Sequence, residues 1–383
     1  MITEQEFFSR LAAVRKLMED EMIDALIIGS SAQLDQRGLL RWLMGYYLPV
    51  FEETVVIPSE GAPIYFAHDA LGAYHAANSP LHPEPRIISA ALYLSDPAAP
   101  VAEYLRSIYA RRIGIAGATG LSAHFFNSLT RHLNTVPIDV SWQVANLRMV
   151  KSPAEIALTR AAIKLNEDTL LAYVNEVHAG GYEPDALAVG YAFAALAGAE
   201  DQYWMSGSGS PAIVAPVAVA KSFRHCWQKT DYNFIVIEHS APGGHFGEIS
   251  QLLKIGQRDP ELESAQSAVV EAILAAAEMI RPGNTVGQVA AAAERRLVAG
   301  GWMQPRSANT CAAPIGHGQG LDFWEIPSID ADNKQLIVPG MRFNLHPSVV
   351  MSDGNKVSYC DCYVSTQSAA ERLSTLPYQV IYC

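Results

Sequence analysis

Two glycine-framed segments near the end of the sequence place the strongest constraint on what this chain can fold into. The first is Gly316-His317-Gly318-Gln319-Gly320-Leu321-Asp322, and the second is Pro339-Gly340-Met341-Arg342-Phe343-Asn344-Leu345-His346-Pro347. A histidine between two glycines has its backbone held close to a neighbour and its imidazole free to enter a cleft. The second segment is a Pro-Gly turn followed by an apolar strand that ends at His346. Together they predict an enclosed polar pocket.

Both segments resemble motifs of the pita-bread family, which includes methionine aminopeptidases, prolidases, aminopeptidase P and creatinase. Members of that family read roughly GHGxGLDxHExP and PGMxxxxEP, whereas this sequence reads GHGQGLDFWEIP and PGMRFNLHP. The frame is the same, but Trp324 replaces the second histidine of the first motif and His346 replaces the glutamate of the second. The resemblance implies a carboxyl-terminal pita-bread α+β domain with a curved antiparallel sheet.

The composition is that of a globular protein and argues against some partners. The chain has 383 residues, of which 50% are hydrophobic and 17% charged, a length typical of about two domains. A net charge of −12 argues against binding to nucleic acid or to an anionic membrane. The longest apolar runs are shorter than the ~20 residues of a membrane span, and the amino terminus lacks a signal-peptide pattern. The cysteines at 226, 311, 360, 362 and 383 form no CxxC pair, so we expect a reduced, cytoplasmic protein.

The first part of the chain alternates helical and strand patterns, which is typical of an α/β domain. Apolar residues at helical spacing predict a helix over residues 4–21. Short apolar runs predict strands at residues 23–29, 54–58, 63–67 and 113–116. This part also resembles the amino-terminal domain of creatinase, prolidase and aminopeptidase P, which implies a homodimer in which Trp42 reaches over the partner's active site. We place this domain at residues 1–148.

The second part, residues 149–383, begins at a junction that resembles the LRxxKSPxEI segment of the same family. Ser152 followed by Pro153 and Glu155 predicts a helix start, with Ser152 as the N-cap. Helical patterns then predict helices over residues 154–179, 184–199, 262–280 and 286–297. Two helix pairs interleaved with strands fit the pita-bread domain that the resemblance implies.

The family's metal-binding relatives hold two ions with two aspartates, the HGxG histidine and two glutamates. The resemblance puts Glu238 at the first aspartate and Glu248 near the second, one residue early. His317 is retained, His346 replaces a glutamate, and the last position falls at Cys360, with Asp361 beside it. Because metal ligands need defined distances, these changes predict the loss of a standard two-metal centre.

These substitutions leave imidazoles and carboxylates that suit proton transfer. We therefore expect His317, His346, Glu238, Glu248 and Asp361 to be catalytic, without a cofactor. A single divalent metal held by His317, His346 and either Glu238 or Glu248 is the alternative. The remaining polar and aromatic residues of these segments are expected to bind the substrate: His239, His245, Trp204, Trp324, Glu325 and Trp42.

The leading functional hypothesis is a creatinase-like hydrolase that cleaves a C–N bond of a small polar metabolite without a two-metal centre. One alternative is a metal-dependent Xaa-Pro peptidase-like enzyme, or a lyase, with altered metal ligands. Another is a non-catalytic ligand-binding protein with the same fold. The expected partners are a small-molecule substrate and a second copy of the chain.

Overall fold

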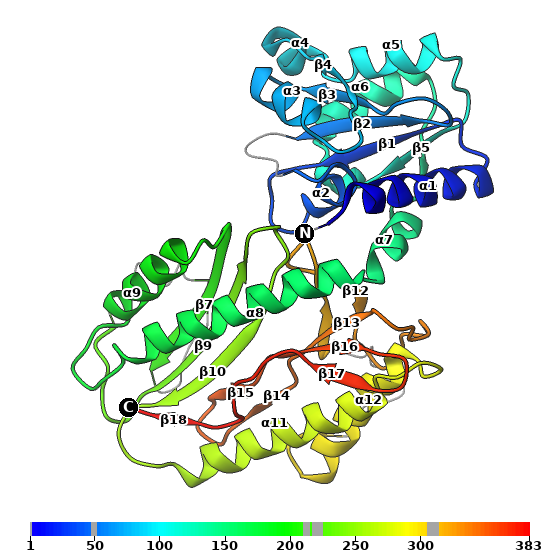
Figure 1. The fold of residues 1–383 in the computed structure, drawn as a ribbon. Coiled ribbons are helices and arrows are strands. Elements are labelled where there is room, and N and C mark those ends of the chain that lie inside the picture. Colours follow the sequence, from blue (N-terminus) through cyan, green and yellow to red (C-terminus); the bar gives the residue numbers. More distant parts are fainter. Residues whose placement is uncertain (1, 47–51, 210–214, 217–224, 305–313) are drawn as a thin grey trace. The chain divides into compact units, whose positions relative to one another are not determined.

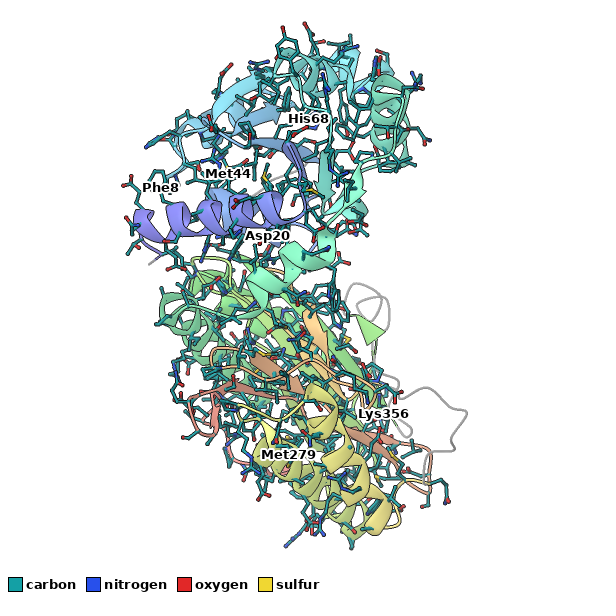
Figure 2. All side chains as sticks on the ribbon, turned by 90° about the vertical axis from the view of Figure 1, so that its right-hand side faces the viewer. Phe8, Asp20, Met44, His68, Met279 and Lys356 are labelled. Carbon is teal, nitrogen blue, oxygen red and sulfur yellow. The ribbon has the colours of Figure 1, made fainter. Side chains whose placement is uncertain are left out.

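A computed structural model describes residues 2–46, 52–209, 215–216, 225–304 and 314–383. The chain forms two compact units, residues 1–148 with 321–323, and residues 149–320 with 324–383 (Figure 1). In both units side chains fill the space between the sheets and their helices (Figure 2). Cys311 lies outside the described residues, and Cys226, Cys360, Cys362 and Cys383 are free thiols.

The amino-terminal unit is built on one mixed six-stranded sheet with the strand order β4-β3-β2-β1-β5-β6. The antiparallel pairs are β1–β2 and β2–β3, and the other neighbours are parallel. Its strands are β1 (Ala25–Ser30), β2 (Glu53–Pro58), β3 (Ile64–Ala67), β4 (Glu84–Ile87), β5 (Ile113–Ala116) and β6 (Ile138–Asp139). The helices are α1 (Glu4–Asp20), α2 (Gly38–Met44), α3 (Ala70–Ala77), α4 (Ala90–Ser95), α5 (Ala99–Ser107), α6 (Ala123–Leu133) and α7 (Ser141–Met149).

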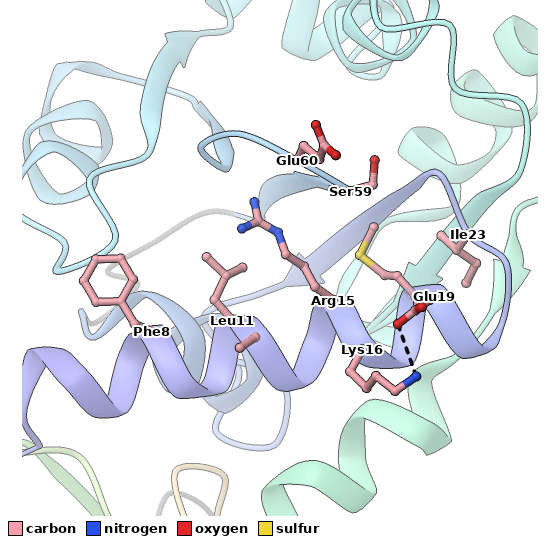
Figure 3. A pocket seen from close by; sticks show the side chains of 10 residues that line it. Phe8, Leu11, Arg15, Lys16, Glu19, Ile23, Ser59 and Glu60 are labelled. Atoms are coloured by element: carbon pink, nitrogen blue, oxygen red, sulfur yellow. Dashed lines mark hydrogen bonds and ion pairs between the residues drawn. The ribbon is translucent and has the colours of Figure 1, made fainter.

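A pocket of about 680 Å³ lies between α1 and the turn after β2 in this unit (Figure 3). Its walls include Phe8, Leu11, Arg15 and Lys16. Arg15 already donates to the carbonyl oxygens of Pro58 and Gly61, and Lys16 pairs with Glu19 and Asp20 on its own helix. The two basic side chains of this pocket, Arg15 and Lys16, therefore already have partners within the same unit.

The described residues of the carboxyl-terminal unit form two five-stranded sheets and a two-stranded one, β14 (Ser348–Val350) with β15 (Lys356–Ser358). The first sheet has the order β18-β10-β9-β7-β8, with bounds β7 (Asp201–Gly209), β8 (Ala215–Pro216), β9 (Tyr232–Ser240), β10 (Ile249–Lys254) and β18 (Ile381–Tyr382). The second has the order β12-β11-β13-β16-β17, with bounds β11 (Gly316–Gly318), β12 (Glu325–Ser328), β13 (Arg342–Leu345), β16 (Asp361–Ser365) and β17 (Ala370–Arg372). Only the β10–β18 pair is parallel among these described strands.

Two helix pairs pack on these sheets, as the sequence predicts (Figure 1). The first pair is α8 (Pro153–Val174) and α9 (Glu183–Leu196), and the second is α11 (Pro260–Met279) and α12 (Val286–Ala299). Helix α8 begins with a capping box in which Ser152 and Glu155 satisfy each other's backbone amides. The α/β and pita-bread fold classes are therefore confirmed, although the expected single curved sheet is divided into two.

Residues of β9 are buried on both faces, and their alternation decides which side chains reach the site. Val236 belongs to the core that includes α11, α12 and β13, and Glu238 points to the same side because it lies two residues further on. Ile237 belongs to the core that includes α8 and α9, and His239 points to that side. Neighbouring residues of one strand thus have different surroundings.

Candidate functional site

Three side chains from separate segments of the carboxyl-terminal unit converge on one point. One ligand atom from each of Glu248, His317 and His346 lies within 4.8 Å of the other two. The Nε2 atom of His317 is 3.8 Å from Oε2 of Glu248, and the rings of the two histidines have centroids 5.2 Å apart. Glu248 and His317 are buried, while His346 is half-buried. The cluster therefore has a polar interior and one side nearer to solvent.

The pairing of β11 with β13 brings the two histidines together. His317 is opposite Asn344 in this pair, and the amide of His346 donates to the carbonyl oxygen of Ile315 at 2.7 Å, which extends the contact beyond β13. A Cβ atom on Gly316 would lie 1.9 Å from the carbonyl oxygen of Asn344. Glycine is required there because the neighbouring strand leaves no room for a side chain. The predicted close backbone approach is confirmed.

Hydrogen bonds fix the orientation of these ligands. Nδ1 of His317 lies 2.8 Å from the carbonyl oxygen of Gly318, which can only accept, so Nδ1 carries the hydrogen. The lone pair of the neutral ring is then on Nε2, the atom that faces Glu248. The Nδ2 group of Asn344 donates to Oε2 of Glu248 at 2.6 Å. A backbone carbonyl that accepts the Nδ1 hydrogen, as at His317, is typical of metal-binding histidines.

The surroundings of the cluster lower the pKa of both His317 and Glu248. Burial lowers the pKa of His317, although the Glu248 carboxylate opposes the shift. Burial acts to raise the pKa of Glu248, but the imidazoles of His346 and His317 and the bond from Asn344 hold it below its ordinary value. An ionised carboxylate beside a neutral imidazole is the protonation state that metal binding requires.

Glu238 lies next to this cluster as a second buried acid. Ile237 pairs with Ile249 at the end of the β9–β10 ladder, so Glu238 and Glu248 follow on the same face of the sheet. Gln319 donates from Nε2 to Oε2 of Glu238 at 3.0 Å. Burial, followed by the neighbouring Glu248 carboxylate, raises the pKa of Glu238 well above its ordinary value. Four of the five residues expected to be catalytic are thus neighbours. Glu248, His317 and His346 form the cluster, and Glu238 lies beside it.

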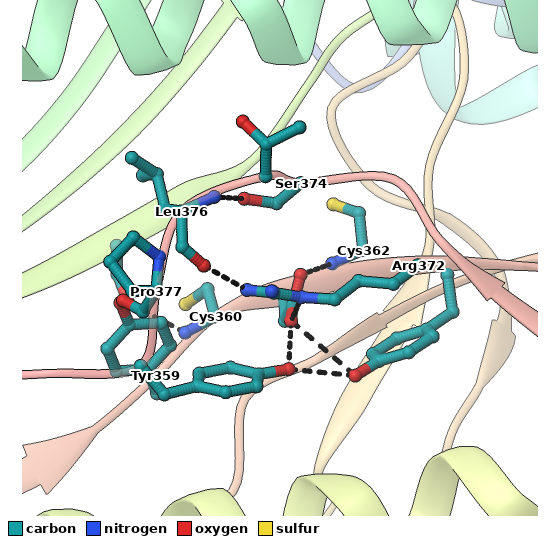
Figure 4. A network of polar contacts seen from close by, with 12 residues as sticks. Tyr359, Cys360, Cys362, Arg372, Ser374, Leu376 and Pro377 are labelled. Carbon is teal, nitrogen blue, oxygen red and sulfur yellow. Dashed lines mark hydrogen bonds and ion pairs between the residues drawn. The ribbon is translucent and has the colours of Figure 1, made fainter.

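Asp361 belongs to a different polar network, the one around Arg372 and Cys362 that Figure 4 shows. Its Oδ2 accepts from Nε of Arg372 at 2.5 Å and from the hydroxyl of Tyr378, and its Oδ1 accepts from the amide of Cys362 at 2.9 Å. Although burial raises its pKa, the Arg372 guanidinium and these donors act in the opposite direction. Asp361 thus links β16 to Arg372 and Tyr378 and does not belong to the group formed by Glu248, His317 and His346.

Two of the expected substrate-binding residues, His239 on β9 and Trp204 on the neighbouring β7, point to the other face of their sheet. His239 and Trp204 are buried in the core beneath α8 and α9, with ring centroids 4.8 Å apart. Burial lowers the pKa of His239 to about 3, so this ring is neutral. Strand alternation therefore turns both side chains away from Glu238, and their role in substrate binding stays a prediction.

Three further expected residues have structural partners elsewhere. His245 is buried with Nε2 3.8 Å from Glu155 near the start of α8. Glu325 accepts from Nζ of Lys151 at 2.6 Å in a buried ion pair. Trp42 belongs to the core of the amino-terminal unit, with the Arg10 guanidinium 5.2 Å from its ring. All three residues thus have partners within the protein, and their role in substrate binding stays a prediction.

Trp324 is the one expected aromatic residue that lies beside the cluster. Its ring centroid is 6.0 Å from that of His317, and 47% of the residue is exposed. Three polar side chains of the same two motifs lie around the cluster and were not predicted from the sequence: Gln319, Arg342 and Asn344. Polar and apolar side chains alternate along residues 342–345, and this pattern could have indicated a strand with Arg342 and Asn344 on one face.

Two family models match the chain. The model described as Creatinase/Prolidase N-terminal domain matches residues 10–150, and the one described as Metallopeptidase family M24 matches residues 157–367. The second match covers more than half of the sequence. The protein is therefore a two-domain member of the pita-bread class, and the chain belongs to metallopeptidase family M24.

Named relatives agree with this membership. Probable dipeptidase PepE of Mycobacterium tuberculosis is 29% identical over 65% of this chain, and the match spans 64% of the length of that relative. Ectoine hydrolase of Halomonas elongata is 24% identical over 99% of this chain and 97% of its own length. The crystal structure of dipeptidase PepE from Mycobacterium ulcerans has a TM-score of 0.81 and 23% identity, covering 100% of this chain and 99% of that one. At that identity the structural likeness shows the fold alone.

These findings correct the leading functional hypothesis. The matching family is one of metallopeptidases, and several relatives are named dipeptidase or Xaa-Pro dipeptidase, including that of Pyrococcus furiosus. The hypothesis of a metal-free, creatinase-like hydrolase is therefore wrong, and the findings favour the alternative of a metal-dependent peptidase-like protein. None of the helices in the described parts of the chain is long and apolar enough to cross a membrane.

Proposed function

We propose that this protein is a metal-dependent peptidase-like hydrolase that cleaves the amide bond of a dipeptide, with a single divalent cation at Glu248, His317 and His346. Membership of a metallopeptidase family supports the reaction class. The observation that carries the metal site is the convergence of the three ligand atoms within 4.8 Å. Two imidazoles and one carboxylate form a known ligand set for zinc, iron and cobalt.

The residues present fit one cation rather than two. The gap of 3.8 Å between His317 Nε2 and Glu248 Oε2 is longer than a hydrogen bond and leaves the lone pair of Nε2 available. Asp361 is engaged by Arg372, and Glu238 by Gln319, so neither joins the three ligands. A bound divalent cation would polarise the substrate carbonyl and acidify a water molecule.

The chain's own residues have separate tasks in this proposal. Asn344 and the carbonyl of Gly318 orient Glu248 and His317 before substrate binds. Glu238 is a buried carboxyl group beside Glu248 that would hold or release a proton during the reaction. The half-buried side of the cluster, with Trp324 near His317, faces the substrate and contributes an apolar surface.

Metal analysis and hydrolysis assays test this proposal directly. Protein purified without chelators should carry one equivalent of a divalent transition metal, and it should hydrolyse members of a dipeptide panel that includes Xaa-Pro substrates. A chelator should abolish hydrolysis, and the restored metal should recover it. His346→Ala should lose both metal and activity with an unchanged circular dichroism spectrum, whereas His178→Ala, at an exposed position, should retain both.

The full-length match to ectoine hydrolase adds one more compound to the same panel. Ectoine turnover without dipeptide turnover would change the substrate class while leaving the metal requirement in place. Protein that hydrolyses dipeptides at full rate without any bound metal would contradict the proposal.

A further inference from the structure

Glu238 and Glu248 are two buried acids that repel each other. A cation bound at Glu248, His317 and His346 would compensate the charge of Glu248 more than that of Glu238. The two carboxyl groups lie side by side at the end of the β9–β10 ladder, and both residues are about 3% exposed. Neighbouring buried acids repel each other strongly because the surroundings screen charge poorly. In a two-ion centre the second cation would relieve this repulsion. Here a different positive group is available.

That group is the guanidinium of Arg342, which is 2% exposed. Its side chain lies on the same face of β13 as that of Asn344, since the two are separated by one residue. Nη1 donates to the carbonyl oxygen of Phe246 at 2.6 Å, and Nη2 donates to Oε1 of Gln319. Among the residues that the structure describes, Nε of Arg342 has no hydrogen-bond partner. The Thr159 hydroxyl and the Cys362 thiol also accept from the guanidinium, each at 3.5 Å, so these partners that hold it in the site are all uncharged.

Gln319 connects this guanidinium to Glu238. Its Oε1 accepts from Arg342 while its Nε2 donates to Oε2 of Glu238 at 3.0 Å. The amide thus has a fixed orientation, with its donor end toward the carboxyl group. A carboxyl oxygen that receives this hydrogen bond is directed toward Gln319 rather than toward the three metal ligands.

We propose that Arg342, acting through Gln319, takes the place of the second cation at Glu238, so that the site holds one divalent ion only. This inference rests on the proposed function, because it assumes that an ion binds at Glu248, His317 and His346. Even with both carboxyl groups ionised, a single dication together with the guanidinium outweighs them by one charge. A second dication would leave a large uncompensated positive charge in a buried pocket, which is strongly unfavourable. Arg342 is a positioning residue in this scheme.

Cobalt titration of the full-length protein, followed by visible absorption and equilibrium dialysis, tests the ion count. The wild-type chain should bind one equivalent of Co²⁺. Arg342→Met removes the charge but keeps an apolar stem, and it should bind a second equivalent. Arg342→Lys retains the charge and should bind one equivalent, as the matched control.

The possible failures are distinguishable. A wild-type chain that binds no Co²⁺ would overturn the proposed function and this inference with it, whereas one that binds two equivalents would overturn this inference alone. A single equivalent in Arg342→Met, bound with unchanged affinity, would also overturn it.

A double variant covers the case in which Arg342→Met fails to fold. If Arg342 compensates Glu238, then Glu238→Gln should rescue folding of Arg342→Met, because the uncompensated carboxyl group is removed. The double variant should then bind one equivalent of Co²⁺. Equal instability of the single and double variants would contradict the role of Arg342, since a purely structural guanidinium would give that result.

Discussion

The tautomer of His317 determines which atom of this residue can bind a ligand. Because the carbonyl of Gly318 takes the hydrogen of Nδ1, the ring presents Nε2 to Glu248 in every neutral molecule. Asn344 in turn holds Oε2 of Glu248 and has a Cys362 thiol near its own oxygen, with Sγ to Oδ1 at 3.0 Å. These outer contacts restrict the ligands to one geometry before any ion arrives.

Removing the Asn344 amide should therefore weaken metal binding without removing a ligand. We expect Asn344→Ala to raise the metal dissociation constant by about 10- to 100-fold, as is usual for outer contacts of metal ligands. Competition with a chromophoric chelator would measure the change. Asn175→Ala, at the exposed end of α8, is the matched control and should leave the constant unchanged. An unchanged constant in Asn344→Ala would show that Glu248 needs no support.

Glu53 predicts a pH dependence of stability in the amino-terminal unit. Burial, followed by the nearby Asp69 carboxylate, raises the pKa of Glu53 from 4.5 to about 8, and among the described residues its Oε2 has no hydrogen-bond partner. The folded chain therefore keeps a proton that the unfolded chain releases. The stabilisation is complete below about pH 4.5 and is lost as pH rises toward 8.

Glu53→Gln should remove this dependence. We expect the free energy of unfolding of the wild type to fall, between pH 5 and pH 8.5, by on the order of 2 kcal/mol more than that of the variant. Urea unfolding at both pH values would measure the difference. Parallel pH profiles for the two proteins would show that Glu53 ionises freely in the folded state.

At the scale of elements, the contact between β11 and β13 allows no side chain at Gly316. A Cβ there would meet the Asn344 carbonyl oxygen, so Gly316→Ala should separate the two strands that carry His317 and His346. We expect a loss of about 1–3 kcal/mol or more in stability, together with weaker metal binding. Gly300→Ala, at an exposed helix end with a φ of −80°, should change the melting temperature little. Equal melting temperatures for both variants would contradict this account.

The buried pair of Lys151 and Glu325 links the start of α8 to β12. Their side chains are 4% and 6% exposed, so Lys151→Met should leave an uncompensated carboxylate and destabilise the chain by about 3–5 kcal/mol. Adding Glu325→Leu should recover most of that loss, because the buried charge is then gone. Thermal unfolding of the two variants would measure both changes. If Glu325 bound the substrate instead, Lys151→Met would change the Michaelis constant rather than the stability.

At the scale of the whole molecule, the sequence was sufficient for most of the fold because its signals are local. Helix starts such as Ser152 with Glu155, and apolar runs such as residues 113–116, specify their elements without distant contacts. The division into two five-stranded sheets depends on contacts between distant strands, such as β10 with β18, which no local pattern reports.

The site was predicted in part for the same reason. Motif positions located Glu238, Glu248, His317 and His346, but residue type alone could not show that His239 points to the opposite face or that Arg372 engages Asp361. Arg342 and Asn344 were overlooked because their importance depends on the partners that they meet in the folded chain. The homodimer and the cytoplasmic location remain predictions.

The pairing of β18 with β10 has a practical consequence for work on this protein. Ile381 and Tyr382 cover one side of β10, the strand that begins directly after Glu248. Cleavage or deletion of the last few residues would leave the amides and carbonyls of β10 exposed, in the way that promotes aggregation between sheet edges. Substitutions that break the pairing of Ile381 with Leu253 should therefore promote aggregation while leaving Glu248, His317 and His346 unchanged.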